Sequence, residues 1–399
     1  MRREHALRRF AALVVLLLGC VGFATTRAAT AALPKPTAPD AALAAVPIGH
    51  VFLIVLENES YKDTYKHNPN HYLGKKLQRQ GTLLTHYYAI GHASLDNYLA
   101  MISGQAPNPS TSGDCPAYSK FKPTTHPVTI DQHGQAVGKG CVFPASVPTL
   151  ADQLSARDIS WAGYMEQMGR TPSREQQTCG VPSLNRDGKD ATQAATRHDQ
   201  YAARHNPFVY FHSLLNSGRC ASHVVRLGQL HTDLNSVGTT PQFAFITPDL
   251  CNDGHDKPCK GTDTAGSRKG GLVSVDHFLR LYVPLIKASP AYQQDGLIII
   301  ISDESNRSDT RSCCHEQQGP NQAKPGRIGP GGGKVGSLVI GKCVQRGTKD
   351  PARYNHYSLL RSLEDLYGIA TGGTDGSGHL GFAAAAGLRP FGTDLFSSC

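Results

Sequence analysis

The stretch Val51-Phe-Leu-Ile-Val-Leu-Glu57-Asn58-Glu59-Ser60 decides the fold, because six consecutive apolar residues end abruptly in polar side chains. An unbroken run of aliphatic and β-branched residues is typical of a strand buried on both faces, as in a parallel α/β sheet. In such sheets, ligands bind beyond the carboxyl ends of the strands. We therefore expect Glu57 and Asn58 to lie at a binding site for a cation or a phosphate.

A second apolar run ends in the same way. Residues 296–302 read Gly-Leu-Ile-Ile-Ile-Ile-Ser, and Asp303 and Glu304 follow. A single acidic pair after a strand is usually the start of a solvated loop. A parallel sheet, however, would place this pair beside Glu57 and Asn58, and oxygen donors at that density suit a divalent cation. The duplication therefore favours a metal site.

Strand and helix patterns alternate along the rest of the chain. This alternation predicts an α/β fold, a mainly parallel central sheet flanked by helices on both faces. Residues 105–145 are rich in Pro, Gly, Ser and Thr and are expected to form a long loop. Further strands are expected at residues 84–90, 159–164, 243–249 and 335–340, and helices at residues 73–83, 96–103, 147–154, 273–288 and 357–367.

The N-terminus has the pattern of an export signal. Four arginines stand within the first nine residues, residues 11–24 are nearly all apolar, and small residues follow. These 14 apolar residues are fewer than the roughly 20 that span a bilayer, so cleavage is favoured over a retained anchor. Cys20 leaves lipid attachment as a minor alternative. We predict a signal peptide over residues 1–32, a Pro/Ala-rich linker over 33–47 and a single catalytic domain over 48–399, secreted, periplasmic or at the cell surface.

Ten of the 11 cysteines lie outside the predicted signal peptide. An even number in an exported chain indicates disulfides, and the absence of a Cys-x-x-Cys pair argues against a zinc site. We expect the local bridges Cys115–Cys141 and Cys251–Cys259. The adjacent residues Cys313 and Cys314 are expected to bond to two different partners.

The charge argues against nucleic acid as a partner. Loss of the signal peptide removes five arginines and one glutamate and lowers the formal net charge from +9 to +5. The chain has no basic run with interleaved aromatic residues. The remaining excess would at most attract an anionic substrate or a lipid surface. No stable membrane span is expected after cleavage, and the oligomeric state stays open.

A serine in a turn is the candidate nucleophile. The segment Gly91-His92-Ala-Ser94-Leu-Asp96 precedes a predicted helix, so the Ser94 hydroxyl would lie near backbone N–H groups and the positive end of the helix dipole. A bound cation would lower its pKa and activate it. On local sequence alone, a serine at this place is more often only a helix cap.

Three histidines stand in segments rich in polar residues. His255 follows a predicted strand in Pro248-Asp-Leu-Cys-Asn-Asp-Gly-His255-Asp256, His356 precedes the last predicted helix, and His315 follows two cysteines. A histidine titrates near neutral pH, which suits phosphate binding or protonation of a leaving group. An isolated histidine is more often a surface residue, and this consideration weighs most against His315.

Five segments in this order resemble the bacterial phosphoesterase family that joins acid phosphatases with phospholipases C, within the alkaline phosphatase superfamily. They are Glu57-Asn58, His92-Ala-Ser94 with Asn97-Tyr98, residues 248–256, Asp303-Glu304 and residues 355–365. The resemblance covers residues 51–368. Asp96 departs from it, because family members commonly have proline there, and this change would affect the stiffness of the turn rather than the chemistry.

The resemblance implies an alkaline-phosphatase-like fold and a metal-dependent phosphomonoesterase with a phosphoserine intermediate on Ser94. The substrate would be a small phosphate ester or a phospholipid headgroup, phosphoinositides included. Ser94, His255 and His356 would be catalytic. One divalent cation of unknown identity would be held by Glu57, Asn58, Ser94, Asp303 and Glu304, and the substrate would contact Asn58, His92, His255, His315 and His356.

Three other functions compete with this interpretation. A phospholipase C would need room for a diacylglycerol group, and family phospholipases C are typically much longer. A secreted binding protein without activity is disfavoured because Glu57, Ser94, Asp303 and Glu304 are all present. A sulfatase would need a Cys/Ser-x-Pro-x-Arg motif, which the sequence lacks.

Overall fold

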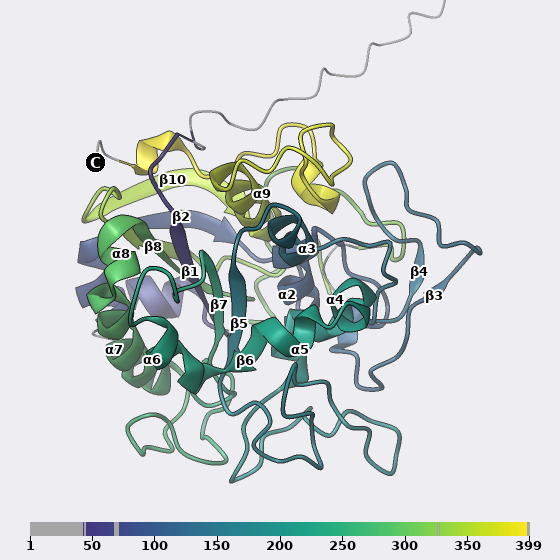
Figure 1. The fold of residues 1–399 in the computed structure, drawn as a ribbon, viewed down its shortest axis with the longest axis horizontal. Coiled ribbons are helices and arrows are strands. Elements are labelled where there is room, and N and C mark those ends of the chain that lie inside the picture. Colours follow the sequence, from purple (N-terminus) through teal and green to yellow (C-terminus); the bar gives the residue numbers. More distant parts are fainter. Residues whose placement is uncertain (1–42, 44, 68–71, 325, 327, 397–399) are drawn as a thin grey trace, which may run out of the picture. The chain divides into compact units, whose positions relative to one another are not determined.

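An eight-stranded sheet lies at the centre of the computed structural model, which describes residues 43, 45–67, 72–324, 326 and 328–396 (Figure 1). The strand order is β10-β2-β9-β8-β1-β7-β5-β6. β9 is antiparallel to both neighbours and the other neighbouring pairs are parallel, which confirms a mainly parallel α/β sheet. The strands are β1 (His50–Leu56), β2 (Thr82–Tyr88), β5 (Trp161–Met165), β6 (Val224–Arg226), β7 (Phe243–Thr247), β8 (Gly296–Ser302), β9 (Ser337–Gly341) and β10 (Thr348–Asn355).

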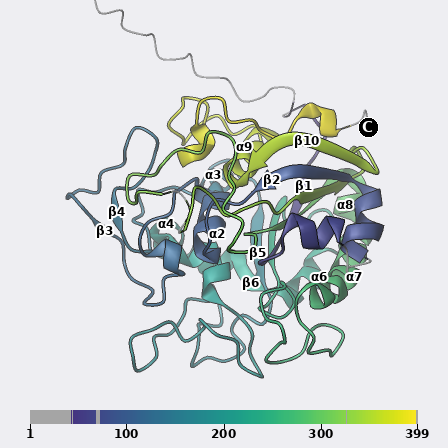
Figure 2. The ribbon, with the colours of Figure 1, turned by 180° about the vertical axis from the view of Figure 1, so that it is seen from behind.

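Helices cover both faces of this sheet, as predicted (Figures 1 and 2). Successive side chains of a strand point to opposite faces, and β1 is apolar on both. Val51, Leu53 and Val55 belong to one apolar core with residues of α2 and α9, whereas Phe52 and Ile54 share another with α7. The helices are α2 (Ser94–Ser103), α3 (Leu150–Ser155), α4 (His212–Asn216), α5 (Arg219–His223), α6 (Leu230–Asp233), α7 (Leu272–Ala288), α8 (Pro290–Asp295) and α9 (His356–Leu366).

Short segments of π and 3₁₀ type and one small hairpin complete the elements. The helix expected over residues 73–83 is replaced by two of these segments, because Gly81 is extended and packs its backbone against Val339, so that β2 starts at Thr82. The hairpin pairs β3 (Lys122–Pro123) with β4 (Gly138–Lys139) inside the expected loop. The other segments are η1 (Lys62–Lys66), η2 (Tyr72–Leu77), η3 (Gln78–Gln80), η4 (Thr111–Gly113), η5 (Ala203–His205), η6 (Pro207–Tyr210), η7 (Leu227–Gln229), η8 (Gly381–Ala384) and η9 (Thr393–Leu395).

The cysteines are disulfide-bonded as a set, with one difference from the predicted pairing. Cys115–Cys141 and Cys251–Cys259 are confirmed, Cys179 pairs with Cys220, and Cys343 is bonded too. The expectation that Cys313 and Cys314 bond to different partners is wrong, because they bond to each other. Cys314 and the following His315 both have positive φ angles, so the bridge lies in an irregular turn.

The predicted signal peptide and most of the predicted linker lie outside the described residues. Leu43, near the end of that linker, is fully buried in the core. In the part of the chain that the structure describes, no helix combines the length and the apolar character needed to cross a membrane.

A buried histidine next to α9 makes stability depend on pH. His379 lies 2.9 Å from Asp365 Oδ1 and 2.5 Å from Asp375 Oδ2, and its side chain is fully buried. Burial alone would lower its pKa, but the two carboxylates outweigh it and raise the pKa to about 9. A raised pKa means that protonated His379 stabilises the fold below the unfolded-state pKa of roughly 6.5, and that this contribution is lost as pH rises through about 9.

We therefore predict that His379→Gln destabilises the protein most at pH 6 and progressively less up to pH 10. The difference in unfolding free energy between wild type and variant should shrink by about 3 kcal/mol across that range. Denaturant unfolding at several pH values measures it. A difference that stays constant with pH would contradict a charged His379.

Candidate active site

Ser94 is the first residue of α2, and its hydroxyl donates a hydrogen bond to Glu57 Oε1. Asn97 holds the preceding turn: its Oδ1 accepts from the N–H groups of Ile90 and Gly91 at 2.8 and 3.1 Å, and its Nδ2 donates to the carbonyls of Gly91 and Ala93. This explains the Asn that follows the serine in the sequence motif. The predicted nucleophile is thus fixed beside the end of β1.

Backbone hydrogen bonds join the residues that follow β1 and β8. Asp303 Oδ1 accepts from the N–H groups of Asn58 at 3.1 Å and of Glu304 at 2.5 Å. Asn58 has a φ of 56°, which Asn tolerates better than most residues, and its Nδ2 donates to Glu57 Oε1 at 3.3 Å. The four side chains expected at this sheet edge are therefore held together.

Three of these side chains form a buried cluster of carboxylates. Oxygen atoms of Glu57, Asp303 and Glu304 lie within 4.8 Å of one another. Asp303 Oδ2 and Glu304 Oε2 are buried without a hydrogen-bond partner among the described residues. Burial and the neighbouring carboxylates raise the pKa of Asp303 well above its usual range, and burial raises that of Glu304 to about 7. Buried carboxylate oxygens without a hydrogen-bond donor fit a divalent cation.

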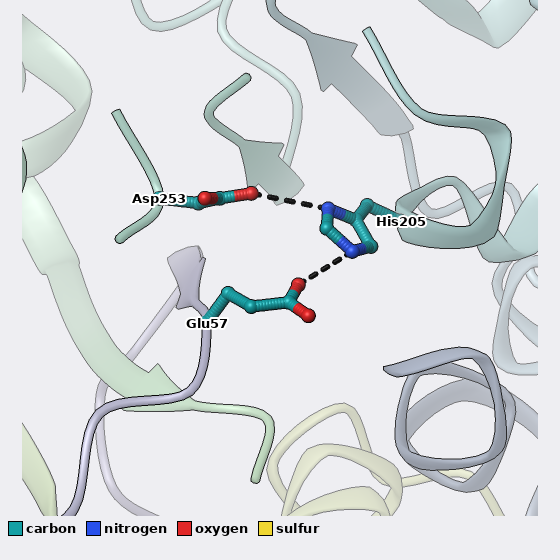
Figure 3. A group of neighbouring side chains, drawn as sticks. All are labelled: Glu57, His205 and Asp253. Atoms are coloured by element: carbon teal, nitrogen blue, oxygen red, sulfur yellow. Dashed lines mark hydrogen bonds and ion pairs between the residues drawn. The ribbon is translucent and has the colours of Figure 1, made fainter. Parts of the chain in front are cut away.

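A second group of ionisable residues shares Glu57 with the first (Figure 3). The imidazole of His205 lies between two carboxylates, with Nε2 2.5 Å from Glu57 Oε2 and Nδ1 3.1 Å from Asp253 Oδ2. Burial lowers the pKa of His205 to about 4. Burial would raise the pKa of Glu57, but His205, His255 and Arg204 outweigh it and lower the pKa to about 2. A neutral His205 thus supports an ionised Glu57.

Burial also favours a proton on Asp253, the carboxyl group next to Nδ1 of His205. Burial and the charge of Glu57 raise the pKa of Asp253 well above its usual range. A protonated Asp253 can donate to Nδ1 of His205, which leaves the ring hydrogen on Nε2, facing Glu57. The Glu57 backbone N–H also donates to the Asp253 carbonyl at 2.8 Å. Asp253 and His205 therefore form a support that orients Glu57 toward Ser94.

Arg204 brings a buried positive charge to the site. Its guanidinium donates to the Gln193 carbonyl at 2.8 Å and lies 3.2 Å from His255 Nε2. Burial would lower its pKa, but Glu57, Asp114 and Asp253 outweigh burial and raise it. Arg204 therefore stays charged.

His255 is the most open of the histidines at the site. Its side chain is 33% exposed, and its Nδ1 lies 2.8 Å from Asp256 Oδ1. Burial would lower its pKa, but Asp256 and Glu57 outweigh burial and raise it. The ring therefore binds a proton more readily than a free imidazole, and it remains accessible to a ligand.

The other predicted histidines have different surroundings. His92 is buried beside Glu304, with Nδ1 3.4 Å from Glu304 Oε2 and Nε2 3.0 Å from the Asp309 carbonyl. His356 is fully buried, with Nε2 2.6 Å from the Asp303 carbonyl and Nδ1 3.2 Å from the Tyr87 hydroxyl. His315 is exposed in a cavity lined by Cys313, Glu316, Arg353 and Arg389, and no hydrogen bond or ion pair among the described residues joins it to the site.

Sequence reasoning missed Arg204, His205 and the role of Asp253. Arg204 and His205 belong to η5, a short 3₁₀ turn, and do not follow a strand. Asp253 lies in the loop of residues 248–256, in which a functional role was predicted from the sequence for His255 only. The sequence offers one weak signal for them: Arg204 and His205 are adjacent and directly precede Asn206-Pro207. Such a segment looks the same as an ordinary surface turn, because its hydrophobic periodicity indicates neither a strand nor a helix.

The chain is similar in sequence to two curated acid phosphatases. The probable acid phosphatase of Kluyveromyces lactis is 25% identical over 78% of this chain and 56% of its own length, and the phosphate-repressible acid phosphatase of Penicillium chrysogenum is 28% identical over 74% and 54%. This chain thus spans about half the length of these relatives. A solved protein in the alkaline phosphatase superfamily from Vibrio parahaemolyticus aligns with a TM-score of 0.43 at 13% identity, over 81% of this chain and 67% of that one.

A family model matches a part of the sequence of similar length. It covers residues 63–370, a range that contains Ser94, His205, Asp253, Asp303 and Glu304, and its description is the phosphoesterase family. Since this match extends over most of the 399 residues, the chain belongs to the phosphoesterase family.

Proposed function

We propose that this protein is a secreted, metal-dependent phosphomonoesterase that forms a phosphoserine on Ser94. The observation that carries the proposal is the hydrogen bond from the Ser94 hydroxyl to Glu57, inside a buried cluster of carboxylates with unpartnered oxygens. The family and the acid phosphatases to which the chain is similar support the same activity. Phosphoinositide headgroups are included among the substrates.

The cation would be held by Glu57, Asn58, Asp303 and Glu304 together with the Ser94 oxygen, where it would lower the pKa of the hydroxyl and neutralise phosphate oxygens. The Ser94 oxygen attacks phosphorus in line with the leaving alcohol, so a P–O bond to serine forms as the ester bond breaks. Glu57 is the acceptor of the serine hydrogen in the structure. Water then attacks the phosphoserine and releases phosphate.

Arg204 and His255 would act on the substrate. A buried guanidinium can neutralise charge on the non-bridging phosphate oxygens, and the accessible ring of His255 can give a proton to the leaving alcohol. His92 was predicted to contact the phosphate, but its Nδ1 lies 3.4 Å from Glu304 Oε2 and its Nε2 lies 3.0 Å from the Asp309 carbonyl, so we assign it the positioning of Glu304. His356 has both nitrogens engaged, one of them on the Asp303 carbonyl, so we assign it the positioning of Asp303.

A direct test compares three substrates before and after chelation. We expect hydrolysis of p-nitrophenyl phosphate to exceed that of bis-p-nitrophenyl phosphate and of phosphatidylcholine, because a monoester needs space for a single substituent. Removal of divalent cations with EDTA should lower this activity by about 10²-fold or more, and added cation should restore it. Preference for the diesters would point to a phospholipase C instead, and absence of hydrolysis would favour a binding protein.

A further inference from the structure

A cavity of about 740 Å³ lies beside the candidate active site, in the size range of small-molecule sites. Residues of η1 form one wall, and the loop after Glu304 together with Lys334 forms the other. We call it the lysine cavity, and its lining includes Ser60, Lys62, Lys66, Ser305, Arg311 and Lys334.

Positive charge exceeds negative charge in this cavity. Four cationic side chains line it, from Lys62, Lys66, Arg311 and Lys334, against the two carboxylates of Asp63 and Asp309. Each carboxylate already has partners outside the lysines: Arg311 binds Asp309 through two nitrogen atoms at 2.6 and 2.7 Å, and Ser60 and Asn306 donate to Asp63.

The three lysines have no ion-pair partner in the part of the chain that the structure describes. No ion pair joins Lys62, Lys66 or Lys334 to a carboxylate of the described residues. The ammonium groups of Lys334 and Lys66 lie 4.4 and 5.9 Å from the centroid of the same Tyr61 ring. Burial and the nearby cations Arg311 and Lys66 lower the pKa of Lys334. An anion would relieve this repulsion.

The cavity and the active site share a wall. Ser305, which lines the cavity, directly follows Glu304, and Ser60 stands two residues after Asn58. The ring of His92, two residues before Ser94, contacts both Glu304 and the carbonyl of Asp309. The cavity therefore lies next to residues that follow β1 and β8, on which the candidate active site is built.

A buried hydroxyl in this wall has an unused bonding capacity. Ser305 is fully buried, and its Oγ has no hydrogen-bond partner among the described residues. Leaving such a group unpaired costs free energy. This oxygen is enclosed by the protein, so Ser305 shapes the wall of the cavity and does not itself contact a ligand there.

We propose that the lysine cavity binds a second phosphate group of the substrate, on the side of the leaving alcohol. The preferred substrates are then bisphosphorylated polyols, such as sugar or inositol bisphosphates, rather than simple monophosphates. This inference rests on the proposed function, because it assigns the first phosphate to Ser94. Phosphate binds most strongly to several charged donors at once, which Lys62, Lys66 and Lys334 can supply.

The test compares glucose 1,6-bisphosphate with glucose 6-phosphate at one ionic strength. The variant Lys66→Gln/Lys334→Gln should lower the ratio of their kcat/KM values at least about tenfold, the effect of losing one charge-assisted contact. The control Lys287→Gln/Lys342→Gln removes the same charge from another basic cavity, lined also by Arg79 and Arg346, and should leave the ratio within about twofold. An equal fall of this ratio in both double variants would show only a general electrostatic attraction of the substrate to the protein, and it would overturn the proposal.

Binding separates this inference from the proposed function. Calorimetry with the Ser94→Ala chain should give a dissociation constant for glucose 1,6-bisphosphate that rises about tenfold when both lysines are replaced. This measurement needs no turnover, so it tests the cavity even if the wild-type chain hydrolyses neither sugar phosphate and the proposed function fails. Unchanged binding would overturn the cavity assignment alone.

A further experiment with lipid substrates identifies the source of the second phosphate. Dioctanoyl phosphatidylinositol 4,5-bisphosphate is compared with the 4-monophosphate in the same variants. Lysine-dependent preference for the bisphosphate in the sugar pair, the lipid pair or both supports the cavity and shows whether a soluble polyol or a lipid headgroup supplies the group. Lack of preference in both pairs contradicts it.

Discussion

Replacing Ser94 by alanine should lower kcat/KM for p-nitrophenyl phosphate by about 10⁴-fold or more, the scale on which loss of a nucleophile acts. Ser94 is 3% exposed and its hydroxyl donates to Glu57, so no neighbouring water can simply take the place of this oxygen in the same geometry. Acid-quenched mass spectrometry of the wild type with substrate should also show one covalent phosphate, which maps to Ser94 and is absent from the variant.

Ser103→Ala is the matched control for this experiment. Ser103 ends the same helix, is equally buried, and donates to the Leu99 carbonyl at 2.7 Å. Its loss should affect stability but leave kcat/KM within a few-fold. A Ser94→Ala protein that keeps most of its activity, or a phosphate mapped to another residue, would exclude the serine mechanism.

The ends of β1 and β8 show what can be read from the sequence. Both strands are buried on two faces, so their apolar runs are continuous and their boundaries are sharp, and parallel pairing then places Glu57, Asn58, Asp303 and Glu304 at one sheet edge. Ser94 was predicted by a different argument, from its place in a turn directly before a predicted helix, and it is the first residue of α2.

Other features of the fold and the site depend on tertiary contacts that no local sequence pattern indicates. Arg204 and His205 belong to a 3₁₀ turn that does not directly follow a strand in the sequence. Only the folded chain shows that His205 contacts Glu57. β10 was not predicted because its sequence, Thr-Lys-Asp-Pro-Ala-Arg-Tyr-Asn, reads as polar loop; it is the edge strand, where Pro is tolerated. The pairing of Cys313 with Cys314 likewise depends on a turn with left-handed residues.

Replacing Asp303 by asparagine should remove both cation binding and activity without destabilising the cation-free protein. Asparagine keeps Oδ1, which accepts the N–H groups of Asn58 and Glu304. It loses the negative charge at Oδ2, which lies unpartnered among other buried carboxylates. Activity on p-nitrophenyl phosphate should fall by about 10³-fold or more.

The melting temperature gives the sharper measurement. Like charges about 5 Å apart cost roughly 3 kcal/mol at an effective dielectric constant of 20. The raised pKa of Asp303 has the same cause, together with burial, and its sign means that the cation-free wild type loses stability as pH rises above the ordinary carboxyl pKa. At pH 7 to 8 the cation-free variant should therefore melt at or above the temperature of the cation-free wild type.

Cations should reverse that order. Magnesium, manganese or calcium added to the EDTA-treated wild type should raise its melting temperature by binding only the folded state, whereas Asp303→Asn should not respond. Asp295→Asn is the control, because Asp295 lies at the other end of β8 and pairs with His50, so its variant should keep the cation response. A variant at Asp303 that still gains stability from the cation would show that the cluster of Glu57, Asp303 and Glu304 is not the metal site, and the second group around His205 would then have to hold it.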